Sequence, residues 1–589
     1  MFKIKSIKKS KIAAMATGAA VKIIIAVVCG ALLLTGTYGV IKHTVLPNTK
    51  TRTKALADYN GTGGAGGGGF ADYVKYTDDF EDGPVQSYFY GSLENAIADA
   101  NNNTTANALS DVTGAKAKIE VKEKDGGYIV KPIADCNIAA TQTLSGNYIF
   151  DANGKTISLA SGACLSLSGA DITFRDSENG KIIKDVTSEV GERLIEISSA
   201  STAPSNVRFI NGNYIVKKNG SAGLAAVYMI GTGLTQTCTT TIEGGNFSIE
   251  SNSSKSGTTG LQLRGNVNIS KAKITVKNTN SAATKASNGI MLLDTTGQIN
   301  NCNINAYGGI ATCAARTAGA SYPSTVSLSG GTYTSTTENK KAYTIYGIRN
   351  ISNANINAYV LNNNGKHEGK AWGILIEEAG NFSIKNCNII ADYNAEAGYE
   401  DLVCEGIKIH RVVNEAEIIG CNIKAVREAL SLYGEKIKII GGTYEGIHHG
   451  GAYFCSNKAI VKDATFKKWN YDGKFNKNNF YTNNAVFYVG TASNEVKVYM
   501  DNCKLENANR AVLSSNYNYK NTYLYASNTA FDNLRIDGAN EQGNKGHAYL
   551  GKGATYKTTS SYKTALGVLD ETTYKNVSFT PEYVAKNFN

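Results

Sequence analysis

A three-residue pattern of a small residue, a polar residue and a bulky apolar residue recurs along most of the chain. Its clearest copies are Cys387-Asn388-Ile389 and Cys421-Asn422-Ile423. The small residue recurs at Ala170, Gly212, Gly245, Ala272, Cys302, Gly331, Ala354, Cys387, Cys421, Gly442, Ala464, Cys503 and, in a degenerate copy, Thr529. Successive copies lie 21 to 42 residues apart. A repeat of this period predicts a solenoid, in which each coil buries its apolar face against its neighbours.

The alternation of side chains along a strand explains the pattern. The small and bulky residues point to one face and the polar residue to the other, so stacked coils build inward columns of small and of bulky side chains. Asn or Gly often precedes the small residue, and both tolerate the left-handed backbone of a tight turn. A second strand follows in most repeats, as in Gly260-Leu261-Gln262-Leu263, Gly289-Ile290-Met291-Leu292, Gly373-Ile374-Leu375-Ile376 and Gly406-Ile407-Lys408-Ile409.

These features predict an all-β chain that folds as a parallel β-helix, a solenoid of about twelve or thirteen coils. The alternative solenoid, a leucine-rich repeat, requires a Leu spacing with an Asn ladder that the chain lacks. The 61 Gly and only 6 Pro fit many tight turns within an ordered sheet.

The N-terminal residues have a different pattern. Residues 1–17 are basic, and residues 18–41 are apolar except for Lys22 and long enough to cross a bilayer. No small-x-small cleavage site closely follows the apolar core, so we expect an uncleaved transmembrane helix, with a signal-like segment as the alternative. The basic residues favour a cytoplasmic N-terminus and an extracellular β-helix, which makes the chain a single-pass protein of the cell membrane.

Composition divides the remaining chain. Seven Gly within residues 61–69 indicate a flexible linker. Ser92–Ala100 has helical spacing with Ser92 as its N-cap, and this helix is expected to cover the open end of the solenoid. The predicted segments are a basic cytoplasmic tail (1–17), a transmembrane anchor or signal-like segment (18–41), a basic stretch and Gly-rich linker (42–69), an N-terminal cap region (70–118), the parallel β-helix (119–556) and a C-terminal cap or tail (557–589).

Charge excludes one class of partner. The formal net charge is +11, but residues 1–54 hold ten Lys and Arg and no acidic residue. The rest of the chain therefore carries 60 − 10 = 50 basic against 49 acidic residues. A nucleic-acid-binding domain would carry a basic excess, so no nucleic-acid partner is expected.

The 11 Cys are scattered, without the short spacings of a metal site. Four of them, Cys302, Cys387, Cys421 and Cys503, occupy the small position of the pattern. We interpret these as buried thiols that serve as small apolar side chains. No metal or cofactor is predicted, although the composition leaves Ca²⁺ open.

Two stretches resemble known families. Residues 21–34 (Val-Lys-Ile-Ile-Ile-Ala-Val-Val-Cys-Gly-Ala-Leu-Leu-Leu), followed by Thr44-Val45-Leu46-Pro47, resemble the Flp-type pilin-like membrane helices of Gram-positive bacteria. Residues 148–157 (Tyr-Ile-Phe-Asp-Ala-Asn-Gly-Lys-Thr-Ile) and the coils that follow resemble the right-handed parallel β-helix (pectate-lyase-like) surface proteins of Gram-positive bacteria. This second resemblance implies a right-handed coil, but its scaffold carries lyases, hydrolases and non-catalytic adhesins.

Candidate chemistry gathers between residues 367 and 482. Four of the six His lie there, and charged loops are expected to enter one edge just before the second strand, at Lys366-His367-Glu368, Tyr399-Glu400-Asp401, Arg427-Glu428 and His448-His449. Because coils stack about 4.8 Å apart, equivalent loops should converge on one cleft. The Asn-Thr-Asp, paired-Asp, Gly-His-Gly and Arg-Ile-Lys motifs of polygalacturonase-like proteins are absent from the coils.

Two sets of residues follow as predictions. The catalytic candidates are Glu377, His410 and Tyr433, which are expected at equivalent outward places in consecutive coils, together with Arg411. The ligand-binding candidates are His367, Trp372, Glu400, Asp401, Glu428, His448, His449 and Trp469. A carboxylate, an imidazole, an Arg and a Tyr on one face would suit proton abstraction beside a uronate carboxyl, and paired carboxylates would suit glycoside hydrolysis.

The sequence favours an adhesin-like or glycan-binding surface protein without catalysis. Its expected partner is an extracellular polysaccharide or a host or cell-surface glycan. A polysaccharide lyase or glycoside hydrolase acting on acidic glycans is the first alternative, and a structural spacer is the second. Polar loops without any function would produce the same charge pattern.

Overall fold

The computed structural model describes residues 86–588. Within that range the segments 111–116, 125–126, 188–190, 199–203, 219–222, 231–237, 256, 319–324, 339–340, 362–368, 378–379, 395–402, 447–450, 469–484, 490–495, 507–509, 515–521, 533–534, 540–546 and 558–567 are not described. The described chain is all-β, and its parallel strands stack as a β-solenoid of the kind that forms a parallel β-helix. The prediction of an all-β chain with stacked parallel strands is therefore confirmed.

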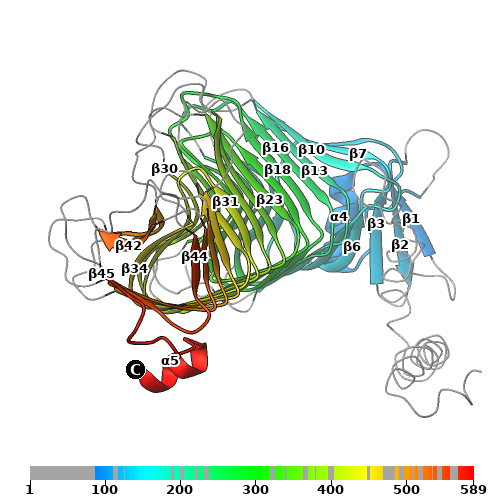
Figure 1. Cartoon of the computed structure of the whole chain (residues 1–589). Helices are drawn as coiled ribbons and strands as arrows, with labels where there is room; N and C mark the ends of the chain where they lie inside the picture. Colours follow the sequence, from blue (N-terminus) through cyan, green and yellow to red (C-terminus); the bar gives the residue numbers. More distant parts are fainter. Residues whose placement is uncertain are drawn as a thin grey trace, which may run out of the picture. The chain divides into compact units, whose positions relative to one another are not determined.

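One sheet of 16 strands, here sheet B, is parallel throughout. Its strands are β4 (Cys136–Ile138), β7 (Thr156–Leu159), β10 (Lys181–Val186), β13 (Asn213–Lys218), β16 (Asn246–Ser251), β18 (Lys273–Asn278), β20 (Asn303–Tyr307), β23 (Thr332–Glu338), β26 (Asn355–Leu361), β29 (Asn388–Asn394), β31 (Asn422–Ala425), β33 (Thr443–Gly446), β35 (Thr465–Lys468), β38 (Lys504–Glu506), β41 (Ala530–Asp532) and β44 (Thr555–Lys557). Figure 1 shows β7, β10, β13, β16 and β18 lying side by side in this sheet.

The second sheet, here sheet A, has 29 strands among the described residues. They are β1 (Gln86–Tyr90), β2 (Ile119–Lys124), β3 (Gly127–Pro132), β5 (Gln142–Leu144), β6 (Asn147–Asp151), β8 (Leu165–Leu167), β9 (Asp171–Arg175), β11 (Glu192–Ser198), β12 (Asn206–Phe209), β14 (Leu224–Ile230), β15 (Thr239–Ile242), β17 (Thr258–Ser270), β19 (Ser287–Asn300), β21 (Ala311–Ala318), β22 (Thr325–Ser329), β24 (Lys341–Tyr346), β25 (Asn350–Ser352), β27 (Lys370–Ile376), β28 (Phe382–Lys385), β30 (Val403–Ile419), β32 (Glu428–Ile440), β34 (Ala452–Lys462), β36 (Ala485–Val489), β37 (Val496–Asp501), β39 (Arg510–Ser514), β40 (Thr522–Ser527), β42 (Arg535–Ala539), β43 (His547–Leu550) and β45 (Val568–Asp570).

Sheet A has two arms, because most coils cross it twice before they enter sheet B. The first arm contains β24 and β27, and the second contains β25 and β28. In β17, β30 and β32 a single long strand runs through both arms. The register shifts where the arms join, between Arg264 and Gly265 and between Ile409 and Val413. The two arms therefore present separate outer faces.

A left-handed turn leads from the second arm into sheet B. Asn301, Asn353, Asn386, Asn502 and Asn528 all have φ between 47° and 54°, and each precedes the small residue of the repeat. Asn adopts this conformation with less strain than most other residues that carry a Cβ, because its short amide side chain tolerates the left-handed region. The turn predicted from the sequence is confirmed.

Twelve of the thirteen predicted small residues directly precede a strand of sheet B, as Cys387 precedes β29. Ala170 is the exception, because it precedes β9 of sheet A. The other four strands of sheet B, which are β4, β7, β10 and β44, follow none of these residues, so the prediction of twelve or thirteen coils was too low for a sheet of 16 strands. The cysteines Cys302, Cys387, Cys421 and Cys503 are free and buried, as predicted.

Helix α4 (Leu93–Asn102) confirms the predicted N-terminal helix. The Ser92 side chain accepts a hydrogen bond from the Asn95 backbone N–H at 3.3 Å, which caps the helix. Its apolar residues Leu93 and Ile97 are buried. Asn101 donates to the Thr143 carbonyl at 2.7 Å and so fastens the helix to the first coil, beside which it lies in Figure 1.

Helix α5 (Pro581–Asn587) belongs to a C-terminal segment that packs on the outer face of the second arm. Phe579 is fully buried and contacts the stacked rings of Tyr499 and Tyr525. The Phe579 backbone N–H donates to Ser527 at 2.7 Å. The described C-terminal residues therefore lie against the side of the solenoid.

The apolar segment 18–41, the basic tail 1–17 and the linker 42–69 all lie outside the described residues. Among the residues that are described, no helix has the length and apolar character needed to span a membrane.

Candidate functional site

The outer face of the first arm, from β24 to β34, carries a set of aromatic and charged side chains. Strand pairing aligns Tyr343 with Trp372, Trp372 with Glu405, and Glu405 with Glu428, one residue per coil. The adjacent outward column contains Tyr346, Lys408, Ser431 and Tyr453. We call Tyr343, Tyr346, Trp372, Tyr433 and Tyr453 the aromatic strip. All but Trp372 are partly exposed.

Trp372 is the buried centre of the strip. Its ring stacks on Tyr343 with centroids 4.9 Å apart and an angle of 5° between the planes. Its indole N–H donates to the Glu405 carboxylate, and the Lys408 ammonium lies 5.7 Å from its ring centroid. Because only 6% of Trp372 is exposed, this side chain packs within the fold and does not itself present a face to solvent.

Glu405 and Glu428 form a buried pair of carboxyl groups, here the carboxylate pair. They are 3% and 2% exposed. Lys408 contacts Glu405 at 2.8 Å and Arg427 contacts Glu428 at 3.1 Å. Burial raises the pKa of Glu405, and the neighbouring Glu428 raises it further. Burial also raises the pKa of Glu428, against the effect of Arg427. Two such groups hold a proton more readily than an exposed glutamate.

The predicted outward line of Glu377, His410 and Tyr433 exists. Their preceding residues are paired in register as Ile376 with Ile409 and Ile409 with Leu432. The rings of His410 and Tyr433 lie 6.1 Å apart. Tyr346 donates a hydrogen bond to Glu377 at 2.5 Å. These three candidates therefore border the aromatic strip on its solvent side.

Burial and the nearby Glu377 carboxylate raise the pKa of Tyr343 to about 12. The Tyr343 phenol is therefore neutral at physiological pH and is a hydrogen-bond donor, not a base. The chemistry available to a ligand at this face combines partly exposed rings with carboxylate, ammonium and imidazole groups.

The structure corrects the position of Glu428. The sequence places it in a charged loop, but it is the first residue of β32 and is buried. Trp372 lies within β27, directly before the Gly373-Ile374 segment. Residues His367, Glu400, Asp401, His448, His449 and Trp469 lie outside the described residues, as does the side chain of Arg411. The convergence of loops on one cleft remains a prediction.

Sequence reasoning missed Tyr343, Tyr346, Glu405 and Lys408. A signal was present for two of them, because Glu405 and Lys408 flank the Gly406-Ile407 strand that the pattern identified. Glu405 precedes Gly406 as Trp372 precedes Gly373, so aligning the repeats on this glycine would have paired the two residues.

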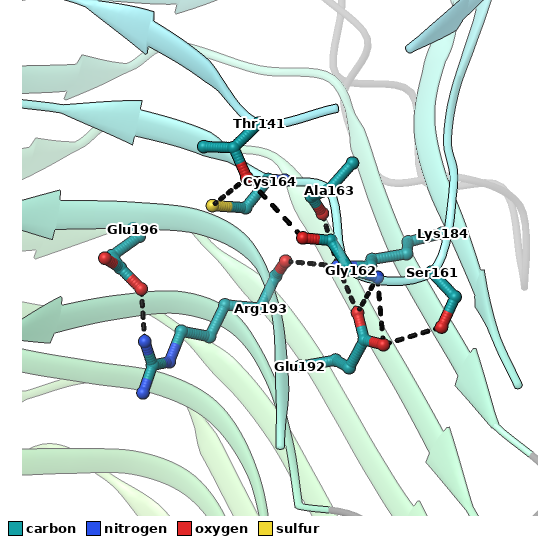
Figure 2. Close-up of polar contacts among 9 residues, drawn as sticks. All are labelled: Thr141, Ser161, Gly162, Ala163, Cys164, Lys184, Glu192, Arg193 and Glu196. Atoms are coloured by element: carbon teal, nitrogen blue, oxygen red, sulfur yellow. Dashed lines mark hydrogen bonds and ion pairs between the residues drawn. The ribbon is translucent and has the colours of Figure 1, made fainter. Parts of the chain in front are cut away.

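Figure 2 shows a second buried polar cluster, at the N-terminal coils. The Lys184 ammonium contacts Glu192 at 2.5 Å and donates to the Arg193 carbonyl at 3.1 Å. Glu192 accepts hydrogen bonds from the Ser161 hydroxyl at 2.7 Å and from the Gly162 backbone N–H at 2.9 Å. Each charged group thus finds partners within the coils themselves, which makes the cluster a link between coils.

The described residues contain no group of three or more His, Cys, Asp or Glu arranged as a metal site. Within that part of the chain the carboxylate pair is held by Lys408 and Arg427, whose ammonium and guanidinium groups stand where a cation would otherwise balance the acids.

Residues 2–61 match a family of unknown function (DUF6133). The match covers the predicted cytoplasmic tail, the apolar segment and the start of the linker, and it stops before the first described strand. No curated protein and no solved structure matches the chain.

Proposed function

We propose that the chain is a membrane-tethered protein of the cell surface whose right-handed, pectate-lyase-like β-helix binds a polysaccharide without catalysis. In this proposal residues 18–41 form a single transmembrane helix of the Flp-like type and the solenoid is extracellular. The host would be a Gram-positive bacterium, as the sequence resemblance implies. The partner would be an extracellular polysaccharide or a cell-surface glycan.

The observation that carries the proposal is the aromatic strip beside polar groups. Tyr346 of β24, Tyr433 of β32 and Tyr453 of β34 are partly exposed, and the last two lie on successive coils. The apolar face of a pyranose ring packs on an aromatic ring, and its hydroxyls take hydrogen bonds from nearby polar groups. Glu377 and His410 stand at the edge of the strip and are suited to these bonds. Rings distributed along the strip from β24 to β34 match an extended polymer better than a single small ligand.

The test is binding of the full chain, in detergent, to a panel of neutral and acidic polysaccharides. We expect Tyr433→Ala to weaken binding about tenfold, which corresponds to the loss of about 1.4 kcal/mol. The control is Tyr359→Ala, which removes a partly exposed tyrosine from β26 of sheet B. Equal binding by the wild-type chain and the Tyr433 variant across the panel would contradict the proposal and leave the structural spacer.

The carboxylate pair favours a second candidate, a glycoside hydrolase or polysaccharide lyase. A carboxyl group with a raised pKa next to a second carboxylate is the arrangement that supplies a general acid and its partner. Glu405 and Glu428 have these properties.

Their burial means that a substrate must reach them through the residues that cover them. New reducing ends or unsaturated products that disappear in both Glu405→Gln and Glu428→Gln would establish this activity. Such products would replace the non-catalytic proposal. Turnover retained in both variants would exclude the pair as the catalytic groups.

A further inference from the structure

Three lysines stack on the outer face of the second arm, away from the aromatic strip. Strand pairing aligns Lys436 of β32 with Lys458 of β34, and Lys458 with Lys497 of β37. Adjacent strands lie about 4.8 Å apart, so equivalent side chains of like charge face each other on successive coils. Directly opposed like charges destabilise a sheet. We call Lys436, Lys458 and Lys497 the lysine column.

The two neighbouring lysines lower the affinity of Lys458 for protons. The pKa of Lys458 is lowered by burial and then by Lys436 and Lys497 on either side. Lys436 is exposed, and Lys458 and Lys497 are partly exposed. Lys458 donates to the Phe588 carbonyl at 3.0 Å, which orders its side chain at the edge of the C-terminal segment. The column is therefore a row of three lysines on adjacent coils, in which the C-terminal segment orders the Lys458 side chain.

The neighbouring outward column shows how the same fold balances charge elsewhere. Glu417 of that column is aligned with Lys438 and contacts it at 3.2 Å, and it also contacts Lys385 of β28 at 2.9 Å. In the lysine column the acidic residue in register is Glu415, which pairs with Lys436 at one end. Glu435 precedes Lys436 in the chain, and Glu582 of α5 lies near Lys438 and Lys462. These acids flank the column, whereas its own successive members are cations.

Aromatic rings continue the column along the solenoid. Lys497 is aligned with Tyr523, and Tyr523 with His547. The Tyr523 and His547 rings stack with centroids 5.0 Å apart at 13°. The Lys497 ammonium lies 6.0 Å from the Tyr523 ring centroid. Both rings are partly exposed, so a row of cations passes directly into a row of stacked rings on one surface.

We propose that the lysine column, with Tyr523 and His547, is a binding surface for a linear glycan that carries regularly spaced anionic groups. Carboxylates or sulfates along the polymer would lie over successive ammonium groups, and sugar rings would pack against Tyr523 and His547. This surface is separate from the aromatic strip, and it rests on the proposed function only in taking the partner to be a polysaccharide.

A polysaccharide fits better than a nucleic acid. Beyond residue 54 the chain carries 50 basic and 49 acidic residues, so the column is a local feature of a nearly neutral molecule. Duplex DNA carries one charge per about 1.7 Å and requires a broad basic surface to neutralise it. A single row of cations one coil apart matches a polymer with one charge per sugar unit.

The experiment measures binding of the full chain in detergent to heparin, polygalacturonate, neutral dextran and duplex DNA at low and high salt. Heparin and polygalacturonate separate sulfate from carboxylate as the anionic group. The test variant is Lys436→Gln/Lys458→Gln/Lys497→Gln. The matched control, Lys217→Gln/Lys277→Gln/Lys424→Gln, removes the same charge from exposed lysines on sheet B.

We expect the test variant to lose at least about tenfold in affinity for one or both acidic polysaccharides and much of the salt dependence. The control variant should bind within about twofold of wild type. The test variant should also melt at the same or a higher temperature, because it removes like-charge repulsion. Tyr523→Ala should weaken the same binding and leave its salt dependence unchanged.

Four results would each overturn the inference. They are equal losses in the test and control variants, dextran binding as tight as polyanion binding, DNA binding tighter than binding to either acidic polysaccharide, or polyanion binding by the test variant as tight as by the wild-type chain. The Tyr433→Ala variant separates this inference from the proposed function. If polyanion binding survives Tyr433→Ala and is lost with the lysines, the lysine column stands. The aromatic strip then fails only if Tyr433→Ala also leaves binding to the neutral polysaccharides unchanged.

Discussion

At the scale of single residues, the carboxylate pair places two acidic side chains next to each other in a buried position, which costs free energy. Glu405 and Glu428 are both buried on adjacent strands. The Trp372 indole, Lys408 and Arg427 supply donors and positive charge. These partners reduce the cost of burying two acids, but burial still raises both pKa values. The two carboxyl groups therefore hold a proton up to a higher pH than ordinary glutamates do.

This predicts a pH-dependent stability. Because the folded pKa values lie above the ordinary value of 4.5, the folded chain binds more protons than the unfolded chain. The stabilisation is complete below pH 4.5 and is lost as the pH rises through the raised values. We expect Glu405→Gln to reduce the fall in melting temperature between mildly acidic and neutral pH. Thermal melts across that range measure it.

The control for this prediction is Glu250→Gln, which removes a half-exposed carboxylate from sheet B. It should leave the wild-type pH profile unchanged. If Glu405→Gln melts with the same pH profile as wild type, the buried pair does not govern the stability of the fold in this range.

At the scale of the element, glycine decides how closely the strands of the first arm approach the core. A Cβ on Gly406 would lie 2.2 Å from the Ile423 Cγ2 and 2.5 Å from the Ala429 carbonyl oxygen. A Cβ on Gly373 would lie 2.4 Å from the Ile389 Cγ2. Neither glycine has a positive φ. These glycines are needed because the missing Cβ leaves room for the bulky residue of the repeat, and not because the backbone adopts an unusual conformation.

Gly406→Ala is therefore expected to lower the free energy of unfolding by about 1–3 kcal/mol, the usual cost of overpacking. Urea denaturation measures the change. Gly191→Ala is the comparison, since its Cβ would come no closer than 3.7 Å to the Gly223 carbonyl oxygen and should change stability by less than about 0.5 kcal/mol. Similar effects of both substitutions would show that the close approach at Gly406 relaxes freely.

At the scale of the whole molecule, each coil contacts mainly the coil before and the coil after it. Phe150, Phe174, Phe209 and Phe247 illustrate this, because their rings contact one another in sequence with centroids 5.1 to 5.8 Å apart. Stability in such a fold is a sum of coil and interface terms. A local defect should therefore remain local.

The buried ion pair between Arg175 and Asp151, 2.8 Å long, allows this to be tested. Arg175→Met leaves the Asp151 carboxylate without its cation, at a cost of about 3–5 kcal/mol. We expect faster amide hydrogen exchange in β6, β9 and β12 and unchanged exchange in β37 and β40. Uniform loss of protection along the chain would instead mean that the solenoid unfolds as one cooperative unit.

The sequence by itself determined the solenoid, its left-handed turns and the burial of the cysteines at the small position of the repeat. These features are local, because the alternation of a strand and the left-handed turn at Asn386 are properties of a few consecutive residues. The helix over Ser92–Ala100 was predictable for the same reason, from one cap and one apolar spacing. Glu377, His410 and Tyr433 were placed correctly because the Gly-Ile strand fixes their position within each coil.

Only the tertiary structure decided which residues meet across coils. Lys436 and Lys458 are 22 residues apart, whereas Lys458 and Lys497 are 39 apart, so no fixed period aligns them. Trp372 and Glu405 meet through strand register alone. The register depends on loop lengths and on the shifts at Gly265 and Val413, and a shift of one residue would move each side chain to the opposite face. The structure of each coil could therefore be predicted from its own sequence. Which side chains face each other on adjacent coils is set by the hydrogen bonds between strands.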